Sequence, residues 1–371
     1  MNKTYLSLPY TLLCVLLNAW ALAAVETIPT PPEEQLQIFE EMAAKETFAC
    51  YDTDEAGNII FVGFNHAYHG RNPFPRSQER RNDKGTVPGL SDEDFQKILH
   101  FPKLRGVAAQ NLKLTDAGYA VLEAFPELEV LNLSNLKTGW PDDYTGPTPG
   151  SRTLQVVDGA RGLKIWDTTH SFGFNDEPAI LNEMQGFPEL KVLIVDVGHA
   201  NDFDELFPFI QKSPNIEFLK LHRCTFSEDQ MRQILEALPN LKRLDMKPNG
   251  NTPGERWSYQ SLALLKDYPN IQYVRLIHGD ALPLPWENGL EHLADANGLT
   301  HIEFPLEDRG RAVDPADIKK LMEARPDLNI LRLPDDLVPA GEDARKRSRT
   351  LRNEMDAGVN PIDHGWAVGP Q

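Results

Sequence analysis

The sequence lacks the features that mark several common classes of protein. Only three of its 371 residues are cysteines, which excludes a disulfide-rich scaffold. It contains no glycine-rich phosphate loop and no Gly-x-Ser-x-Gly nucleophile motif. The net charge of −18 argues against bulk affinity for nucleic acid or anionic membranes. No nucleic-acid partner is therefore expected.

The amino-terminal residues have the pattern of a secretory signal peptide. Lys3 precedes an apolar run over residues 11–17, and the small-residue site Ala21-Leu22-Ala23 follows. The run is too short to span a bilayer, and we expect cleavage after Ala23, with no transmembrane segment in the mature chain. Cys14 lacks the preceding small residue of a lipid-acylation site. The sequence therefore predicts a secreted or periplasmic protein, which carries a net charge of −19 once Lys3 is removed.

An apolar frame recurs along the rest of the chain, in the form apolar-x-x-apolar-x-apolar. Its clearest copies open at Leu128, Ile216 and Leu241, each two residues after a proline. Proline also precedes the copies at Leu104, Leu190, Ile271 and Leu328, whereas Leu299 opens one without proline and Leu163 opens a looser ninth copy. Successive copies are 24 to 35 residues apart, which in most cases leaves room for a strand and a helix. This periodicity predicts a solenoid.

The helical half of the repeat is clearest after Cys224. Ser227 and Gln230 form the pattern of a capping box. Four apolar residues with helical spacing follow it, namely Met231, Ile234, Leu235 and Leu238. Pro239 lacks an amide hydrogen and favours an extended conformation at the preceding residue, so a new strand is expected directly after it.

These repeats resemble the leucine-rich-repeat family, in the longer, helix-containing form typified by ribonuclease inhibitor. The resemblance covers roughly Ser91 to Pro339 and implies an α/β fold, a right-handed leucine-rich-repeat solenoid (horseshoe) with a parallel concave sheet and convex helices. The family places Asn or Cys eight residues after the first Leu, and here only Cys224 and Asn249 match. We therefore expect irregular turns after many strands. The hairpin that precedes the repeats is also similar to secreted bacterial leucine-rich-repeat proteins.

The chain divides into four segments. Residues 1–23 are the signal peptide, 24–90 an N-terminal leader, helix, hairpin cap and polar loop, 91–339 the solenoid, and 340–371 a C-terminal tail. The tail contains a basic run at 345–349, and both a basic helix that closes the solenoid and a disordered tail fit its composition.

The segment before the repeats is expected to cover the open end of the solenoid. Thr30 is placed to cap a helix, with Glu33 closing a capping box. Leu36, Phe39 and Ala43 would form its apolar stripe. Residues 47–51 and 59–64 read as the two strands of a hairpin, and residues 65–90 as a polar loop with no regular structure.

Cys50 and Cys224 are the two cysteines that remain after cleavage. Four repeat steps separate Cys224 from the first frame, and at roughly 4.8 Å per stacked strand this amounts to about 20 Å. The sequence therefore predicts two unpaired thiols.

The positions between framed residues would face outward and form the concave surface. The position between the last two framed residues is occupied by Asn132, Asp167, Ile194, Lys220, Asp245, Arg275, Glu303 and Arg332. The candidate binding residues around its centre are Lys220, His222, Arg223, Lys242, Arg243, Lys247, Arg275 and His278. This cluster is either a docking patch for an acidic protein or anionic macromolecule, or a solvated strand face balanced by Glu217, Asp245 and acidic helices.

Three insertions that each follow a strand carry tryptophan and are expected on one edge of the solenoid. They contain Trp140 with Tyr144, Trp257 with Tyr259, and Trp286. Tryptophan on a loop is a frequent interface anchor. The alternative is that each ring folds back over its own repeat.

The sequence offers little catalytic chemistry. The segment 52–57 begins like a calcium loop but lacks key ligands and reads as a turn. His66 and His69 could hold a metal only with a third ligand, which has no recognisable spacing. We therefore expect an exported, non-enzymatic binding scaffold without a cofactor, which uses its concave sheet and Trp-bearing edge loops. The alternatives are an enzyme or metal-binding protein built on the solenoid, which would use His66 and His69 or the concave histidines, and a structural component of the cell envelope. The sequence leaves the oligomeric state open.

Overall fold

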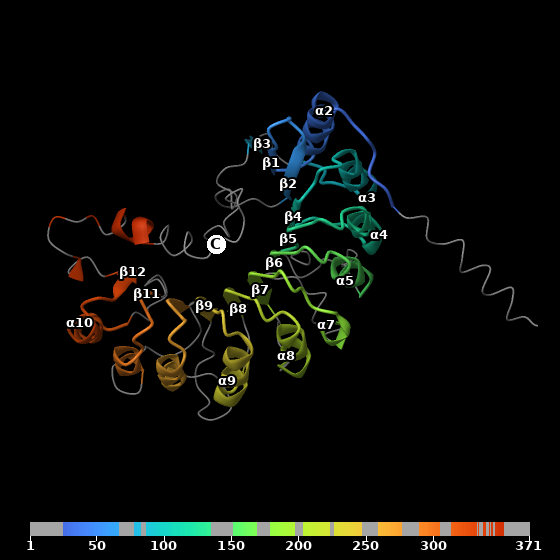
Figure 1. Cartoon of the computed structure of the whole chain (residues 1–371). Helices are drawn as coiled ribbons and strands as arrows, with labels where there is room; N and C mark the ends of the chain where they lie inside the picture. Colours follow the sequence, from blue (N-terminus) through green and yellow to red (C-terminus); the bar gives the residue numbers. More distant parts are fainter. Residues whose placement is uncertain are drawn as a thin grey trace, which may run out of the picture.

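One open sheet organises the molecule. The computed structural model describes residues 25–66, 78–82, 87–134, 151–168, 179–196, 203–222, 226–246, 259–276, 289–304, 313–331 and 346–351, and the short pieces 333, 337–338, 341 and 343. Its 12-stranded sheet has the order β12-β11-β10-β9-β8-β7-β6-β5-β4-β2-β1-β3. The strands line the inner side of an arc and the helices lie along its outer side (Figure 1). Within these residues no helix has the length and apolarity needed to cross a membrane.

Strand and helix alternate along the chain. The strands are β1 Phe48–Thr53, β2 Ile59–Asn65, β3 Gln78–Arg81, β4 Gly106–Gln110, β5 Val130–Asn132, β6 Ile165–Asp167, β7 Val192–Asp196, β8 Phe218–His222, β9 Arg243–Met246, β10 Tyr273–Leu276, β11 His301–Glu303 and β12 Asn329–Leu331. The α-helices are α2 Pro32–Ala43, α3 Asp92–Phe95, α4 Asp116–Tyr119, α5 Ser151–Asp158, α7 Ala179–Glu183, α8 Phe203–Gln211, α9 Glu228–Ala237 and α10 Pro315–Ala324. The 3₁₀ helices are η1 Gln96–His100, η2 Ala120–Ala124, η3 Tyr259–Asp267 and η4 Leu290–Ala294.

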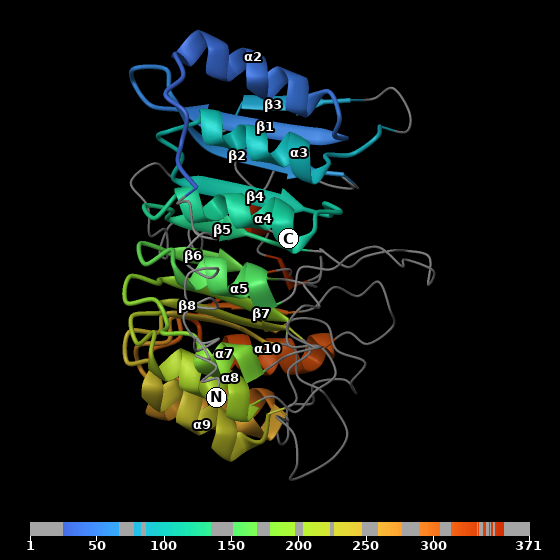
Figure 2. The same cartoon turned by 90° about the vertical axis from the view of Figure 1, so that its right-hand side faces the viewer.

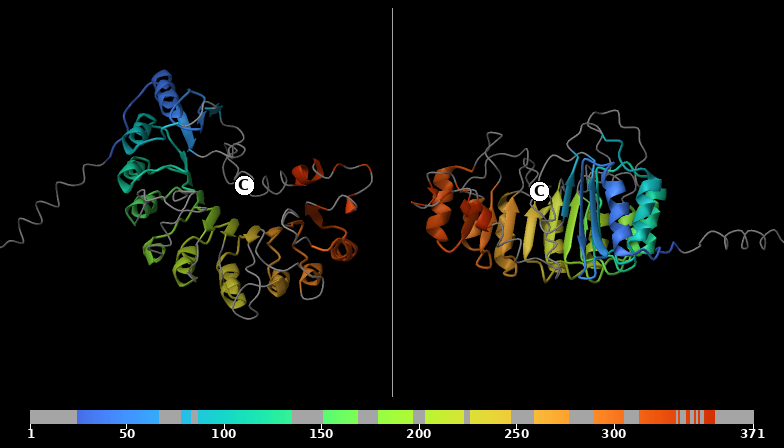
Figure 3. Two further views of the ribbon diagram at one scale, coloured as in Figure 1. Left: turned by 180° about the vertical axis from the view of Figure 1, so that it is seen from behind. Right: turned by 90° about the horizontal axis from the view of Figure 1, so that it is seen from above.

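The repeats stack in parallel. From β2 and β4 to β11 and β12, every neighbouring pair of strands is parallel, whereas β1 pairs antiparallel with both β2 and β3. Figures 2 and 3 show the same stack of strands and helices from the side, from behind and from above. A chain that alternates strand and helix in this way forms an α/β solenoid, and the predicted resemblance to leucine-rich-repeat proteins is confirmed at this level.

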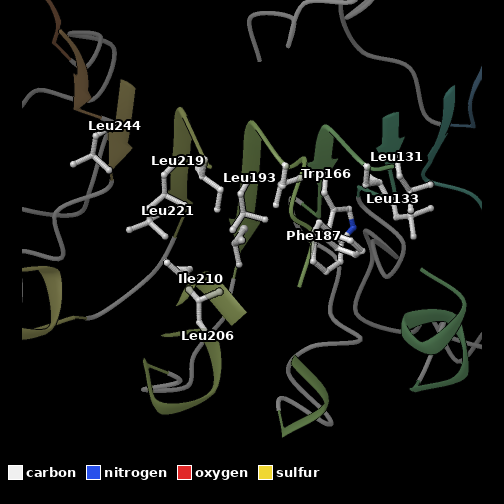
Figure 4. Close-up of a cluster of buried hydrophobic side chains, with 14 of the residues drawn as sticks. Leu131, Leu133, Trp166, Phe187, Leu193, Leu206, Ile210, Leu219, Leu221 and Leu244 are labelled. Carbon is white, nitrogen blue, oxygen red and sulfur yellow. The ribbon is translucent and has the colours of Figure 1, made fainter. Parts of the chain in front are cut away.

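The framed residues form the interior that the sequence predicts. One ladder joins Leu131, Trp166, Leu193, Leu219, Leu244, Val274 and Ile302 across neighbouring strands, and all of these side chains are buried. Figure 4 shows members of this ladder beside Phe187, Leu206 and Ile210 from the helical side. Burying each of these side chains contributes about 1.5 to 3 kcal/mol, so the ladder is a major source of stability. The looser copy at Leu163 belongs to it through Trp166, whose ring lies 5.4 Å from that of Phe209.

Helix boundaries follow from local side-chain bonds. Ser227 Oγ accepts a hydrogen bond from the Gln230 amide, and Gln230 Oε1 accepts one from the Ser227 amide, so the predicted capping box is confirmed. Ser91 and Asp94 form an equivalent box that starts α3. After the end of α8, Asn215 Nδ2 donates to the carbonyl oxygen of Pro188 at 2.9 Å. Asn270 does the same to Pro239, so the recurrent Pro-Asn pair links one repeat to the next.

For the last copy of the apolar frame, which opens at Leu328, the predicted middle position is wrong by one residue. The sequence predicts that Leu331 enters the common interior with Leu328, but Ile330 pairs with Ile302 and occupies that place. Leu331 instead belongs to a small separate cluster with Leu351. Side chains on a strand point to alternate faces, so this shift sends Leu331 to the concave side.

The segment before the repeats differs from the prediction in two details. Helix α2 begins at Pro32 with Pro31 as the cap residue and no side-chain cap, so the expected capping box at Thr30 is wrong. Leu36 is 38% exposed, and the buried polar residue beside it is Gln35. Gln35 donates to the Thr30 carbonyl oxygen at 2.7 Å and accepts from the Ile59 amide at 2.8 Å, which ties α2 to β2.

The polar loop over residues 65–90 also contains regular structure that the sequence analysis missed. Strand β3 pairs antiparallel with the outer side of β1, from Phe48 opposite Arg81 to Tyr51 opposite Gln78. All four β3 residues are exposed and three are charged, so no apolar alternation marked the strand. Charged residues are typical of a protected sheet edge.

Candidate binding face

Two rows of side chains face the concave side of the sheet, between the buried positions of each strand. The first concave row is Val130, Ile165, Val192, Phe218, Arg243, Tyr273 and His301. The second concave row is Ala108, Asn132, Asp167, Ile194, Lys220, Asp245, Arg275 and Glu303. Alternation along a strand places both rows opposite the interior ladder.

The part of this face over β5 to β8 is apolar. Val130, Ile165, Val192, Ile194 and Phe218, which we call the apolar band, form one cluster and are each 5% exposed or less. The cluster continues through Ala108 and Phe61 toward the first strands, and every member lies on a strand. No described helix contributes a side chain to it, in contrast to the interior cluster on the other face of the same sheet.

The part over β8 to β11 is charged. Arg243 donates from Nε to Asp245 Oδ1 at 2.8 Å and from Nη2 to Asp245 Oδ2 at 3.0 Å. Arg275 Nη1 lies 3.8 Å from Asp245 Oδ2, and Arg275 Nε lies 3.5 Å from Glu303 Oε1. Together with Asp167 and Lys220 these residues form what we call the charge ladder. It contains three cations and three carboxylates, so its formal charges cancel.

Lys220 is a buried cation of the ladder. The residue is 7% exposed, and burial lowers the pKa of its ammonium group, while Asp167 and Asp245 oppose that shift. Asn132 Nδ2 donates to Asp167 Oδ2 at 3.0 Å, which fixes the carboxylate at the start of the ladder. A buried ammonium group is tolerated here because carboxylates lie on both sides of it.

Arg243 joins the two parts of the face. Its guanidinium carbon lies 4.2 Å from the centroid of the Phe218 ring, within cation–π range. The same group binds Asp245 through two nitrogens. Beyond it the ring of Tyr273 lies 5.2 Å from that of His301. Arg243 therefore contacts both the apolar band and the charge ladder, and its charge is paired with Asp245 at the point where the two meet.

The structure corrects the expected character of the basic cluster. It brings Lys220, Arg243 and Arg275 together as the sequence predicts, but the expectation of a solvent-facing patch is wrong for Lys220 and for Arg243, which is 6% exposed. Sequence spacing placed the cations correctly, and the alternative in which Asp245 and Glu217 balance the positive charge agrees with the pairs formed by Arg243, Arg275 and Lys242. The sequence does not predict the apolar band, because Val130, Ile165, Val192 and Phe218 lie between framed residues and form no motif of their own.

Lys242 lies apart from the ladder, on the edge where the strands begin. Its Nζ is 2.6 Å from Glu217 Oε2, and Lys191 Nζ is 3.0 Å from Glu217 Oε1. Although partial burial works against it, the hydrogen bonds from these lysines lower the pKa of Glu217. Lys242 is partly exposed. Its partner Glu217 is one of the residues expected from the sequence to balance the positive charge.

Several predicted site residues fall outside the described residues. These are Arg223, Lys247, His278, Trp140, Trp257 and Trp286, together with His69 and Cys224, and for His222 only the place in β8 is described. Cys50 is buried in β1 and forms no disulfide within the described part of the chain.

His66 contacts a buried carboxyl group that sequence reasoning missed. Its Nδ1 lies 3.2 Å from Glu46 Oε2, and Glu46 Oε1 accepts a hydrogen bond from the Leu90 amide. Burial raises the pKa of Glu46 to about 7, and it lowers the pKa of His66. Among the described side chains no group of three metal-binding residues occurs. The sequence around Glu46, a single glutamate just before Thr47 and a strand, does not indicate a buried carboxyl group in contact with a histidine.

The described part of the C-terminal tail includes a helix over residues 346–351, one of the alternatives that the sequence left open. Its Arg347 Nη1 donates to the carbonyl oxygen of Ile330 at 2.6 Å. Its Leu351 is 8% exposed and packs with Leu331, and Tyr273 contacts the same cluster. The helix lies inside the arc beside β12, as both opposite views show (Figures 1 and 3).

Comparison with known proteins assigns the chain to no family. No family model matches the sequence, and no curated protein matches it. Among solved structures, the chain is similar to the leucine-rich-repeat-containing protein LegL7 of Legionella pneumophila, with 17% identity and a TM-score of 0.40 over 72% of this chain and 96% of that one. It is also similar to a protein of Bacteroides fragilis, with 15% identity and a TM-score of 0.40 over 76% of this chain and 95% of that one.

Proposed function

We propose that the protein is an exported, non-enzymatic scaffold that binds an extended apolar segment of another protein on its concave face. The observation that carries this proposal is the apolar band, which is continuous over four strands and receives no side chain from any described helix. Apolar side chains on the outward side of a sheet are typical of an interaction site, and in this structure those of the band are 5% exposed or less. No described helix packs against the band itself, and a concave parallel sheet of this kind suits a partner that lies across its strands.

The partner chemistry follows from the two parts of the face. The charge ladder is internally neutral and largely buried, so it supports register and orientation more than attraction of an anionic polymer. The band offers apolar side chains at the regular spacing of neighbouring strands, which suits a peptide whose apolar residues also recur. Edge loops that carry Trp140, Trp257 and Trp286 would extend this contact, since tryptophan supplies large contact area.

Export and capping are parts of the same proposal. The pattern at residues 1–23 supports secretion or periplasmic localisation. Right-handed crossovers between parallel strands are the general rule and support a right-handed solenoid. Helix α2 with β1, β2 and β3 would cap one end, since β3 presents charged side chains at the edge of the sheet.

A displayed library of random peptides tests the proposal with the mature chain as bait. Apolar peptides should be selected, and the double variant Val192→Thr with Ile194→Thr should bind them roughly tenfold more weakly, because each change keeps the branch at Cβ but replaces an alkyl group with a hydroxyl group. Lys242→Ala, on the strand edge, is the matched control and should bind as the unaltered chain does. Selection of acidic peptides whose binding depends on Lys242 would overturn the proposal.

A further inference from the structure

A row of polar and charged side chains runs along the edge where the strands of the repeats begin. Each member directly precedes a strand, and its amide donates a hydrogen bond to the carbonyl oxygen of the member before it. Neighbouring members are therefore one strand spacing apart, about 4.8 Å. The members of this edge row are, in order, Arg105, Glu129, Lys164, Lys191, Glu217, Lys242, Gln272 and Thr300.

Each glutamate of the edge row lies between two cations and pairs with both of them. The two resulting triplets are Arg105-Glu129-Lys164 and Lys191-Glu217-Lys242. Because each triplet has one carboxylate for two cations, each carries a net positive charge. The whole chain has a net charge of −18, so this edge is a local exception to its acidic character.

The two triplets meet at Lys164 and Lys191, which are neighbours in the edge row. Each of these lysines has its glutamate on the side away from the other lysine. Lys164 Nζ lies 3.4 Å from Glu129 Oε1, and Lys191 Nζ lies 3.0 Å from Glu217 Oε1. Both lysine side chains are 31% exposed. Like charges on neighbouring strands repel each other, and an anion bound between the two ammonium groups would relieve that repulsion.

These two lysines stand directly beside the apolar band. Lys164 immediately precedes Ile165, and Lys191 immediately precedes Val192, both of which belong to the band. A segment of a partner that crosses β6 and β7 over Ile165 and Val192 therefore comes within side-chain reach of both ammonium groups. The same strands thus offer an apolar contact and a pair of positive charges.

We propose that the segment which binds the apolar band carries an acidic side chain, and that its carboxylate lies between Lys164 and Lys191. The proposal rests on the proposed function and adds the chemistry that its partner must have. The β8 end of the band suits an acidic residue less well. There Arg243 already lies over the Phe218 ring and binds both carboxylate oxygens of Asp245.

The acidic position would fix the register of the partner. Apolar side chains alone set register weakly, because neighbouring strands of the band present similar groups. One carboxylate held between Lys164 and Lys191 determines which residue of the segment lies over β6 and β7. The acidic chain as a whole repels a segment with many carboxylates, so the site favours a single acidic residue among apolar ones.

Binding of matched peptides to the mature chain tests the acidic position. Apolar peptides selected from the displayed library should carry Asp or Glu at one recurrent position. Lys164→Gln with Lys191→Gln should bind such a peptide roughly fivefold more weakly, whereas its Asn or Gln counterpart should bind both chains equally. The variant should fold normally in urea unfolding, because each glutamate of the two triplets keeps its other cation.

The matched control removes the same charge from the helices. Lys266→Gln with Lys319→Gln changes exposed positions on η3 and α10, and this variant should bind the acidic peptide as the unaltered chain does. Selected apolar peptides without a recurrent acidic position, or equal affinity of the Lys164→Gln, Lys191→Gln variant for the acidic peptide, would overturn this inference and leave the proposed function in place. If no apolar peptide is selected at all, the proposed function fails and this inference fails with it.

Discussion

The two parts of the concave face differ in chemistry although one backbone supports both. Strands β5 to β8 present the apolar band, and strands β8 to β11 present most of the charge ladder, while the interior ladder beneath them is apolar throughout. The interior rows are constrained because each side chain must fill a closed space. The outward rows change from apolar to charged along the sheet, and their composition therefore carries the information about what the face does.

The largest expected effect concerns the central carboxylate of the charge ladder. Asp245→Asn leaves Arg243 without its two-point partner and Arg275 without one of its two carboxylates. Removing one partner of a buried pair costs about 3 to 5 kcal/mol. Urea unfolding should reveal this loss, and Lys242→Ala, which breaks an exposed pair, should cost no more than about 1 kcal/mol. Equal effects of the two changes would mean that the ladder is not buried in solution.

Glu46 sharpens the comparison, because it is a buried carboxyl group whose neutral form is favoured. Its pKa is about 7 in the folded chain against 4.5 for the ordinary group. The folded state thus holds more protons between these values, and its stability falls as pH rises from about 4.5 to about 7. The full difference is roughly 3 kcal/mol.

The matched variant for Glu46 is Glu46→Gln, which retains an acceptor for the Leu90 amide. Urea unfolding at about pH 5 and about pH 8 should show that the unaltered chain loses stability between these values relative to the variant. An identical pH dependence in both chains would refute the raised pKa of Glu46.

The apolar band should respond as a core does. Ile194→Ala removes a fully buried side chain, for which the cost is about 2 to 5 kcal/mol. A side chain on an open face would cost far less, since water already contacts it. Chemical unfolding of Ile194→Ala beside Leu193→Ala, its neighbour on the interior ladder, should give comparable losses. A negligible loss for Ile194→Ala alone would indicate that the band is open.

The smallest expected effect on the free energy of unfolding comes from a change at Arg243, where the apolar band meets the charge ladder. Arg243→Lys keeps the positive charge but loses the two-point bond to Asp245 and the planar contact with Phe218. We expect a loss of about 1 to 2 kcal/mol in the free energy of unfolding. If Arg243→Lys unfolds as the unaltered chain does, then charge alone holds the ladder at this position.

The sequence predicted the interior but not the exterior of this sheet. The frame at Leu131, Leu193, Leu219 and Leu244 identifies buried positions because each repeat contributes the same position of its strand to the common interior. The shift at Leu331 could not be read from the sequence, since Ile330 and Leu331 are both apolar and contact with Leu351 decides between them.

For the candidate site, the positions of the charged residues could be predicted from the sequence, but their burial could not. Lys220, Arg243 and Arg275 do lie together, but pairing depends on register with Asp245 and Glu303 in neighbouring strands. Glu46 and His66 come together only because β1 and β2 pair with each other, which no local motif encodes.

Thiol labelling tests the central claim, that apolar side chains on the concave side are buried as fully as the interior ladder, most directly. In a Cys224→Ser background, Ile194→Cys should react with a thiol reagent as slowly as Leu193→Cys, which faces the interior, because both positions are fully buried. Rapid labelling of Ile194→Cys beside slow labelling of Leu193→Cys would contradict the account.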